Sequence, residues 1–305
     1  MSADLTVPRD CPSCGGSALE NPPEVRSRIS PDTLSVEQLG SFWGVTSRND
    51  CFFDYRRCGS CGLLHNSTYL RPDLVANFYS QMDDNTAGVP RPLLEETQHR
   101  YLAALEEFVP LAGVYLEVGP DIGLAAEIAI EGGNFTKVVL VEPNQVSRSV
   151  LQQSMHEGMT VVVDSLAELD ESIRVDCLVL IHVLDHLVYP RDDLVGLRRR
   201  MMTGGMMVAV VHDESSLLRR LLRNCWPPFR LQHPQLFSGQ TLTVLLESCG
   251  FTVRSLRATT NTLSLRHLVR LGFSALGGDP GWTVRVPQTR LRVRLGNILV
   301  GAEAK

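Results

Sequence analysis

From Leu111 onward, short apolar runs alternate with longer stretches in which apolar residues recur at helical spacing. Val175–Ile181 is apolar at nearly every position, as expected for a central parallel strand that is buried on both faces. The pattern predicts strands at residues 114–118, 137–141, 159–163, 175–181, 206–211, 251–256 and 291–300, and helices at residues 145–157, 191–202, 213–223 and 239–249. This order predicts an α/β fold, in which helices cover both faces of a mostly parallel sheet.

The first part of the chain is organised around two pairs of cysteines. Cys11 and Cys14 form one Cys-x-x-Cys pair, and Cys58 and Cys61 form the other, each with a glycine after its second cysteine. Four thiolates suit one tetrahedral Zn²⁺, and because they leave no open position the ion would be structural. The alternatives are disulfides, which are rare in cytosolic proteins, and thioredoxin-like redox chemistry, which lacks its βαβ context here.

These patterns divide the chain into three parts. The predicted zinc-binding subdomain is followed by a helical linker and then by the main domain, which carries an insertion with an amphipathic segment. The predicted boundaries are residues 1–70 for the subdomain, 71–110 for the linker with helices at 72–81 and 95–108, and 111–305 for the main domain with its insertion at 257–290. Between the cysteine pairs, residues 21–49 are rich in Pro, Ser and Gly and predict an extended loop.

The stretch at residues 114–123 predicts a ligand-binding corner. A buried strand runs into a turn bracketed by Gly119 and Gly123, which let a ligand approach the backbone at the start of a helix. The next strand ends on Glu142, where doubly wound sheets place an acid that binds the ribose hydroxyls of a nucleoside. A dinucleotide fingerprint requires a glycine at the position of Asp121, so a nucleoside other than NAD is favoured.

The segment from Glu117 to Gly123 resembles motif I of the class I S-adenosylmethionine (AdoMet) methyltransferases, with Asp121 in place of the central glycine. The run at residues 53–65 and the segment at 71–80 resemble the N-terminal zinc domain of one subgroup, which includes deoxysugar C-methyltransferases; the resemblance does not extend to the C-terminal domain of those enzymes. It implies a Rossmann-like seven-stranded sheet, of order 3-2-1-4-5-7-6 with strand seven antiparallel, and a small N-terminal subdomain that binds zinc through four cysteines.

The same resemblance implies how AdoMet would bind. Its methionine end would lie near Gly119, its ribose on Glu142 and its adenine near Asp164, which alternatively caps the following turn. Tyr79, on a helix that covers the cofactor in related enzymes, would reach the AdoMet carboxylate, although surface packing is an equal alternative. The complete expected set of cofactor-binding residues is Tyr79, Glu117, Gly119, Asp121, Gly123, Glu142, Pro143, Asp164, Ser165 and His182.

Polar residues directly after the fourth strand predict the catalytic groups, because the carboxyl ends of central parallel strands face the ligand crevice. His186 or His182 would remove a proton from the acceptor, with Asp185 orienting the base. His233 would contact the substrate, with a packed loop histidine as an equal alternative. Alternatively, His182 lines the cofactor and Asp185 caps a turn. A second alternative is a metal site formed by His182, Asp185 and His186 and completed by His212 or His233.

Composition and charge reduce the number of function classes that fit this chain. The net charge of −5 gives no general attraction to nucleic acid, and no apolar run approaches the about 18 to 20 residues of a membrane span. The start of the chain lacks the features of a signal peptide, so we expect a cytoplasmic protein. We predict an enzyme that methylates a small molecule in secondary metabolism; its oligomeric state is left open, with a homodimer as one option. A zinc-finger RNA methyltransferase and a non-catalytic AdoMet-binding protein are the alternatives.

Overall fold

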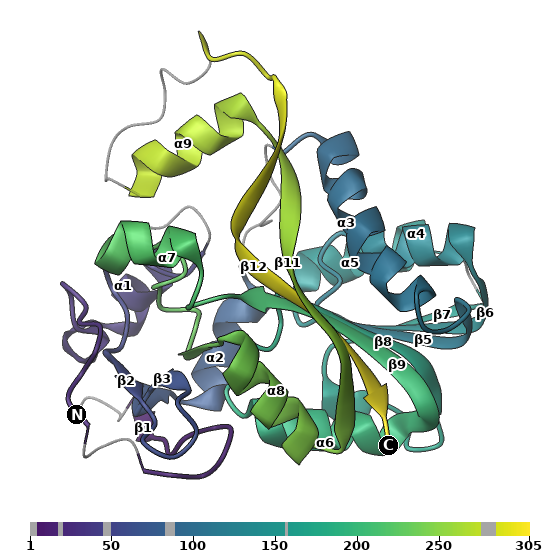
Figure 1. Cartoon of the computed structure of the whole chain (residues 1–305), viewed down its shortest axis with the longest axis horizontal. Helices are drawn as coiled ribbons and strands as arrows, with labels where there is room; N and C mark the ends of the chain where they lie inside the picture. Colours follow the sequence, from purple (N-terminus) through teal and green to yellow (C-terminus); the bar gives the residue numbers. More distant parts are fainter. Residues whose placement is uncertain (1–4, 18–20, 45–49, 83–88, 156–157, 276–284) are drawn as a thin grey trace.

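A seven-stranded sheet forms the centre of the molecule (Figure 1). The computed structural model describes residues 5–17, 21–44, 50–82, 89–155, 158–275 and 285–305. The sheet order is β11-β12-β9-β8-β5-β6-β7, and its strands are β5 (Ala112–Val118), β6 (Asn134–Val141), β7 (Thr160–Val163), β8 (Val175–Ile181), β9 (Met201–His212), β11 (Phe251–Ser264) and β12 (Arg290–Ala304). Strand β12 runs antiparallel to both of its neighbours, and the others pair in parallel. The predicted order 3-2-1-4-5-7-6 is therefore confirmed.

Helices cover both faces of the sheet because successive strand residues point to opposite sides. Along β6, Val139 and Val141 belong to one apolar cluster, whereas Val138 and Leu140 belong to the other. Helices α6 (Pro190–Arg200) and α8 (Gly239–Ser248) pack on the first side, and α3 (Arg91–Glu106), α4 (Leu124–Gly132) and α5 (Gln145–Ser154) pack on the second (Figure 1). The central strands are thus buried on both faces, as their apolar sequences predict.

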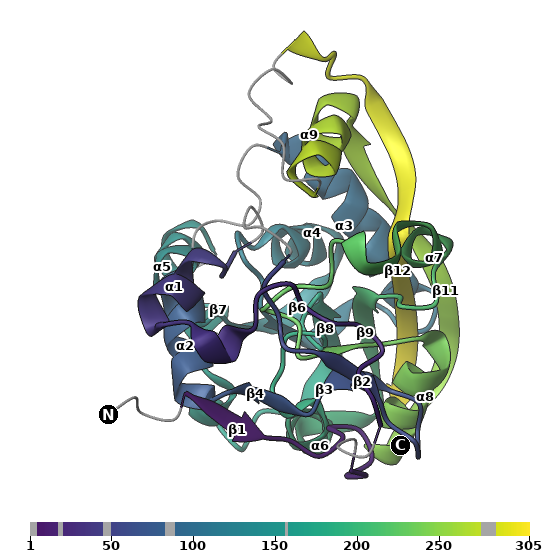
Figure 2. The same cartoon turned by 90° about the vertical axis from the view of Figure 1, so that its left-hand side faces the viewer.

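The last two strands extend well beyond the sheet. Strand β11 continues to Ser264, and its far end pairs only with β12, through Leu263 opposite Leu291. The predicted insertion therefore begins as a continuation of β11, in which β-branched threonines favour the strand. Helix α9 (Leu265–Ala275) follows at the tip of this hairpin, which projects away from the rest of the molecule (Figures 1 and 2).

The N-terminal region packs against the loops that follow β8 and β9. It contains strands β1 (Thr6–Pro8), β2 (Tyr55–Arg57), β3 (Leu64–Asn66) and β4 (Thr68–Leu70), helix α1 (Val36–Ser41) and the short helix η1 (Pro31–Thr33). Strand β3 pairs with β10 (Gln235–Leu236), which belongs to the main domain, so one small sheet joins the two parts. The buried Arg9 guanidinium donates hydrogen bonds to the carbonyls of Pro234 and Val188 and to the Gln235 side chain.

Helix α1 corrects the prediction of an extended loop at residues 21–49. Ser35 and Gln38 form a capping box at its start, in which each side chain binds the backbone N–H of the other residue. This local motif stabilises a short helix within a stretch that has no strong apolar periodicity. The prolines and glycines of this stretch predict a loop, whereas the helix depends on the capping box of Ser35 and Gln38.

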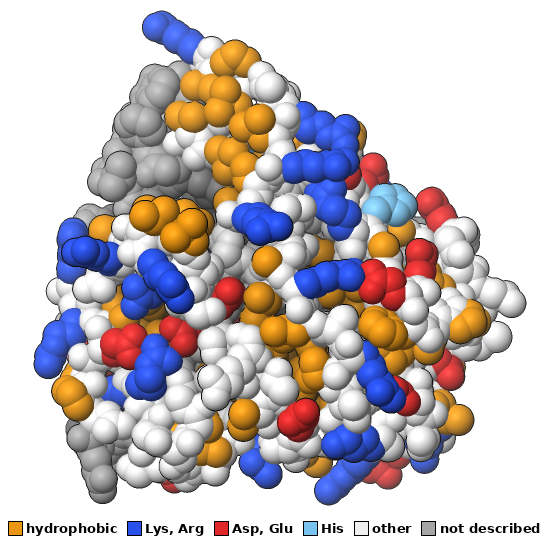
Figure 3. Space-filling model, in the orientation of Figure 1, with side chains coloured by type: hydrophobic (Ala, Val, Ile, Leu, Met, Phe, Trp, Pro, Cys, Tyr) orange, Lys and Arg blue, Asp and Glu red, His pale blue; other side chains and the backbone are white. Residues whose placement is uncertain are grey.

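The linker forms helix α2 (Pro72–Ser80) and helix α3, as predicted. The remaining elements are η2 (Leu166–Glu168), α7 (Leu217–Leu222) and η3 (Arg223–Cys225). Helix α7 exposes Leu217 and Leu221, which form an apolar patch on the surface (Figure 3). Within the described residues, no helix has both the length and the apolar character that crossing a bilayer demands.

Candidate functional site

The predicted corner after β5 is a tight turn held in left-handed backbone conformations. Gly119, Asp121 and Gly123 have φ angles of 65°, 54° and 82°. Gly119 donates its N–H to the Val141 carbonyl at 2.9 Å, and a Cβ on Gly119 would lie 3.1 Å from Val183. Asp121 therefore occupies the position of the missing glycine in a conformation that aspartate tolerates better than most residues.

Glu142 ties this turn to the end of β6. Its Oε2 accepts the N–H of Asp121 at 3.0 Å, and its Oε1 accepts the N–H of Asn144 at 2.7 Å. Burial raises the pKa of Glu142 to about 7. Each oxygen retains a further lone pair, so the carboxylate can accept hydroxyl hydrogen bonds while it holds both loops.

Asn144 connects two parts of the candidate site, a role that the sequence pattern did not predict. Its Oδ1 caps α5 by accepting the N–H groups of Val146 and Ser147, and its Nδ2 donates to the carbonyls of Tyr79 and Met82. Asn144 thus joins the end of α2 to the loop that carries Glu142. An asparagine before a helix signals the cap, whereas the link to α2 depends on tertiary packing.

The other predicted cofactor residues lie in different environments. Glu117 is buried beneath the turn, where it accepts a hydrogen bond from the Tyr115 hydroxyl at 2.8 Å, and burial raises its pKa to about 8. Asp164 is exposed at the end of β7, and Ser165 is the N-cap residue of η2. Pro143 is half-buried in the loop between Glu142 and α5. Contacts of these residues with AdoMet stay predictions.

Tyr79, His186 and His233 form a continuous hydrogen-bonded chain, which we call the histidine chain. The Tyr79 hydroxyl lies 2.6 Å from His186 Nδ1, and His186 Nε2 lies 3.1 Å from His233 Nε2. His233 Nδ1 lies 2.7 Å from the Pro228 carbonyl oxygen. Three distant segments, helix α2, the loop after β8 and the loop after α7, therefore meet at one place.

The direction of these hydrogen bonds follows from the Pro228 carbonyl, which can only accept. His233 Nδ1 must carry a proton, so in the neutral ring Nε2 accepts from His186 Nε2–H. His186 Nδ1 then accepts from the Tyr79 hydroxyl. Burial keeps both rings neutral, because it lowers the pKa of His186 to about 4 and that of His233 well below its usual value.

His182, Asp185 and His212 form a second group, which we call the histidine–aspartate cluster. Each offers one ligand atom, and these atoms lie within 4.8 Å of one another. Asp185 Oδ2 accepts the backbone N–H of His212 at 3.2 Å and lies 3.8 Å from His212 Nε2. Asp185 therefore faces His212 and not His186, which is oriented by His233.

The four predicted zinc ligands come together in the N-terminal region. Their sulfur atoms lie within 4.8 Å of one another, with Cys11 and Cys61 at 3.5 Å and Cys14 and Cys58 at 3.6 Å. Each Cys-x-x-Cys pair forms a tight turn, which we call a knuckle. In each knuckle a glycine with a positive φ angle donates its N–H to the carbonyl of the pair's first cysteine: Gly15 to Cys11 and Gly62 to Cys58. A tetrahedral Zn²⁺ with bonds of about 2.3 Å needs sulfur atoms about 3.8 Å apart, so this group could hold a metal ion.

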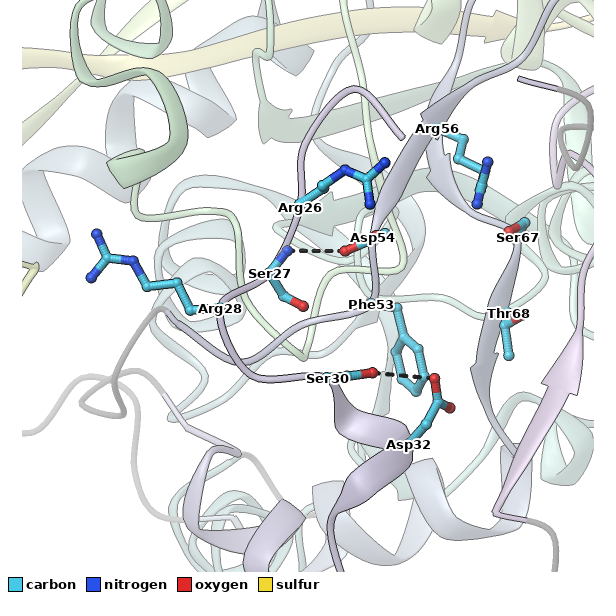
Figure 4. A pocket seen from close by; sticks show the side chains of 10 residues that line it. All are labelled: Arg26, Ser27, Arg28, Ser30, Asp32, Phe53, Asp54, Arg56, Ser67 and Thr68. Carbon is cyan, nitrogen blue, oxygen red and sulfur yellow. Dashed lines mark hydrogen bonds between the residues drawn. The ribbon is translucent and has the colours of Figure 1, made fainter. Parts of the chain in front are cut away.

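The N-terminal region also contains a cavity of about 360 Å³ (Figure 4). Phe53 forms part of its lining, and Arg26, Arg28 and Arg56 supply positive charge. Asp32 and Asp54 balance part of that charge, and they accept hydrogen bonds from the Ser30 side chain and the Ser27 backbone. The predicted site residues do not line this cavity.

Comparison with known proteins supports the fold and identifies a family of domains to which this chain is similar. A family model described as a methyltransferase domain matches residues 93–256, which is more than half of the 305-residue chain. No match was found among curated proteins.

Solved structures that are similar to this chain include the following three. A chain of the complex between the Haloferax volcanii Trm112 methyltransferase activator and a methyltransferase has a TM-score of 0.51 at 12% identity, over 70% of this chain and 92% of that chain. A methyltransferase structure from Bacillus halodurans C-125 has a TM-score of 0.48 at 15% identity, over 68% and 99%. The N-methyltransferase NodS from Bradyrhizobium japonicum WM9 has a TM-score of 0.46 at 12% identity, over 70% and 97%.

The tight turn generates a prediction about stability. In Gly123→Ala the new Cβ would collide with Met155 and lie 2.6 Å from Leu151 Cδ2, in addition to the strain of a positive φ. Gly158→Ala is the matched control, because its φ of 87° is similar but nothing lies within 4 Å of the new Cβ. In denaturant unfolding, we expect Gly158→Ala to cost about 1 kcal/mol and Gly123→Ala about 1–3 kcal/mol more. Equal losses would show that the turn is not closely packed.

Proposed function

Because the chain belongs to the methyltransferase domain family and is accordingly an AdoMet-dependent methyltransferase, we propose that it methylates a small-molecule acceptor of secondary metabolism. The observation that carries this proposal is the pairing of the glycine turn with Glu142 at the carboxyl end of adjacent strands. This is where open α/β sheets bind nucleosides.

The residues present suit AdoMet. When bound, AdoMet supplies an electrophilic methyl group on a positively charged sulfonium. Gly119 leaves room for close approach to the backbone, and Asp121 contributes a carboxylate rather than the phosphate-binding surface of a dinucleotide site. Glu142 would bind the ribose hydroxyls through its remaining lone pairs, and Asp164 would lie near the adenine. Tyr79 and Asn144 would position helix α2 over the cofactor.

His186 is our candidate for the general base. Its Nδ1 is a neutral proton acceptor, and an acceptor hydroxyl or amine could take the position of the Tyr79 hydroxyl there. His233 would orient the ring, because it accepts the His186 Nε2 proton and is itself held by the Pro228 carbonyl. His182 and Asp185 would line the acceptor side of the crevice.

Cys11, Cys14, Cys58 and Cys61, which we call the cysteine group, would bind a structural Zn²⁺ ion. Four thiolates complete a tetrahedral shell, so the ion would have no position for substrate. Its role would be to hold β2 and β3, since a backbone hydrogen bond joins Cys58 and Leu63 at the turn between these two strands. That hairpin in turn pairs with β10 and supports the loop of His233.

The contacts of the clustered arginines favour a small molecule over RNA as the methyl acceptor. The sequence contains two short arginine runs, Arg198–Arg200 and Arg219–Arg220. Arg198 donates to the Gly250 carbonyl, Arg200 donates to the carbonyls of Gly196 and Leu169, and the Arg219 guanidinium lies over the Phe229 ring. These side chains are engaged within the protein, and the net charge is −5. Salt-sensitive binding of RNA would instead favour the RNA methyltransferase alternative.

Glu142 provides the first test of this function. Glu142→Ala removes the carboxylate that would bind two ribose hydroxyls, and charge-assisted hydrogen bonds of about 1.5–3 kcal/mol each imply a loss of AdoMet affinity of at least about 100-fold. Calorimetric titration with AdoMet measures this loss. Glu142→Gln, which keeps an oxygen for the Asn144 N–H, should retain part of the affinity, and Glu131→Ala, at an exposed position on α4, should retain all of it. Undiminished affinity in Glu142→Ala would refute the assignment.

His186 provides the second test. His186→Ala should slow methyl transfer by about 10²–10³-fold under single-turnover conditions while AdoMet affinity stays near normal. Burial lowers the pKa of His186 to about 4, so the base stays deprotonated well below pH 6.5. The acidic limb of the wild-type rate should therefore lie near pH 4 to 5. The exposed His99→Ala is the control, and an unchanged rate in His186→Ala would remove this residue as the base.

Zinc removal provides the third test. Cys58→Ser should lose the zinc ion of the cysteine group and lower the thermal unfolding midpoint, because the folded state gains the free energy of metal binding. Cys225→Ser removes an exposed cysteine outside the group and should change neither quantity. Elemental analysis and calorimetry measure the two effects. A Cys58→Ser protein with its full zinc content would contradict the assignment.

A further inference from the structure

The histidine–aspartate cluster lies at the carboxyl ends of two central strands, next to the histidine chain. His182 and Asp185 follow β8, and His212 is the last residue of β9. The rings of His182 and His212 have centroids 4.7 Å apart, and those of His212 and His233 lie 5.0 Å apart. The cluster therefore borders the place where the acceptor would meet its base.

The tautomer of His212 is fixed by a chain of amide side chains behind it. Asn261 Nδ2 donates to the Tyr101 hydroxyl, and Asn297 Nδ2 donates to Asn261 Oδ1. Asn297 Oδ1 is consequently the atom that faces His212 Nδ1, at 3.0 Å, so Nδ1 carries the proton. His212 Nε2 then presents a lone pair toward Asp185.

The other two members of the cluster each have one buried polar atom without a hydrogen-bond partner among the described residues. Asp185 is 0% exposed, and its Oδ1 has no hydrogen-bond partner among the described residues. His182 Nδ1 is likewise buried and unpaired within the described part of the chain. His182 has a φ of 53°, a strained conformation that places its side chain in this group. A buried carboxylate oxygen without a hydrogen-bond donor destabilises the folded state, and a bound cation would satisfy it.

We propose that His182, Asp185 and His212 bind a divalent transition metal ion, zinc being the ion that two imidazoles and one carboxylate suit best. The hydrogen bond from His212 Nδ1 to Asn297 is the outer contact that orients metal-binding histidines. Ligand atoms about 2.1 Å from an ion lie about 3.4 Å apart in tetrahedral geometry. The 3.8 Å between His212 Nε2 and Asp185 Oδ2 shortens by a small movement of the side chains.

Three protein ligands leave an open position, in contrast to the four thiolates of the cysteine group. A single carboxylate does not neutralise a divalent ion, and the Arg230 guanidinium adds positive charge near His212 and His233. The open position therefore suits an anionic oxygen ligand. This part of the inference rests on the proposed function: the acceptor would carry a carboxylate or an acidic hydroxyl group beside the atom that is methylated.

Metal counting tests the site without measuring turnover. Full-length protein is dialysed against excess Co²⁺, freed of unbound ion and analysed for metal and for visible absorption. Wild type and the exposed-histidine control His99→Ala should hold two ions per chain. Asp185→Asn, which keeps the shape of the side chain, and His212→Gln should each hold one, with the sulfur-to-cobalt absorption of the cysteine group unchanged.

One ion per wild-type chain, or two in both Asp185→Asn and His212→Gln, would overturn the proposal. If His212→Gln does not fold, Asp185→Asn and the wild-type count still decide the question. Calorimetry with AdoMet on the same samples separates the two hypotheses. Intact AdoMet affinity with one ion rejects the metal site alone, whereas absent AdoMet binding rejects the proposed function whatever the metal count.

Discussion

The pairing of β3 with β10 is the interaction on which the site depends. It joins a strand of the N-terminal region to the loop of the main domain that carries His233. The buried Arg9 guanidinium strengthens the junction by binding the carbonyls of Pro234 and Val188, and the Tyr55 hydroxyl donates to the His233 carbonyl at 2.5 Å. A buried guanidinium is tolerated only because these acceptors satisfy it. The carboxyl edge of the sheet is consequently covered by protein near β8 and β9.

Covering this edge changes the chemistry of the side chains beneath it. Burial favours neutral imidazole, and it lowers the pKa of His182, His186 and His212 to about 4. A neutral imidazole has one donor nitrogen and one acceptor nitrogen, so it is determined which partner donates in each of its hydrogen bonds. In the histidine chain each imidazole lone pair accepts a proton, whereas in the histidine–aspartate cluster Asp185 Oδ1 and His182 Nδ1 have no hydrogen-bond partner among the described residues. The same burial would thus provide the proposed proton acceptor and the proposed cation site.

The cysteine group acts on the site through the backbone. Its second knuckle leads directly into β3, and β3 pairs with β10 beside His233. Metal binding there would order the hairpin without contacting the reacting atoms. Helix α2 approaches from the same region, and Asn144 connects its end to the loop of Glu142. The loop of Glu142 and the loop of His233 are therefore both held by contacts with the first 82 residues.

The sequence alone determined the order of the sheet and the grouping of the four cysteines. Apolar runs such as Val175–Ile181 predict central strands, glycines at 119 and 123 predict a tight corner, and four paired cysteines predict a cluster, because each signal is local. Only the tertiary structure decided which side chains form hydrogen bonds with one another. Asp185 faces His212 and not His186, Tyr79 binds His186, and Asn297 fixes the tautomer of His212. These contacts join residues far apart in the chain, and their geometry depends on how the loops pack, which no local pattern encodes.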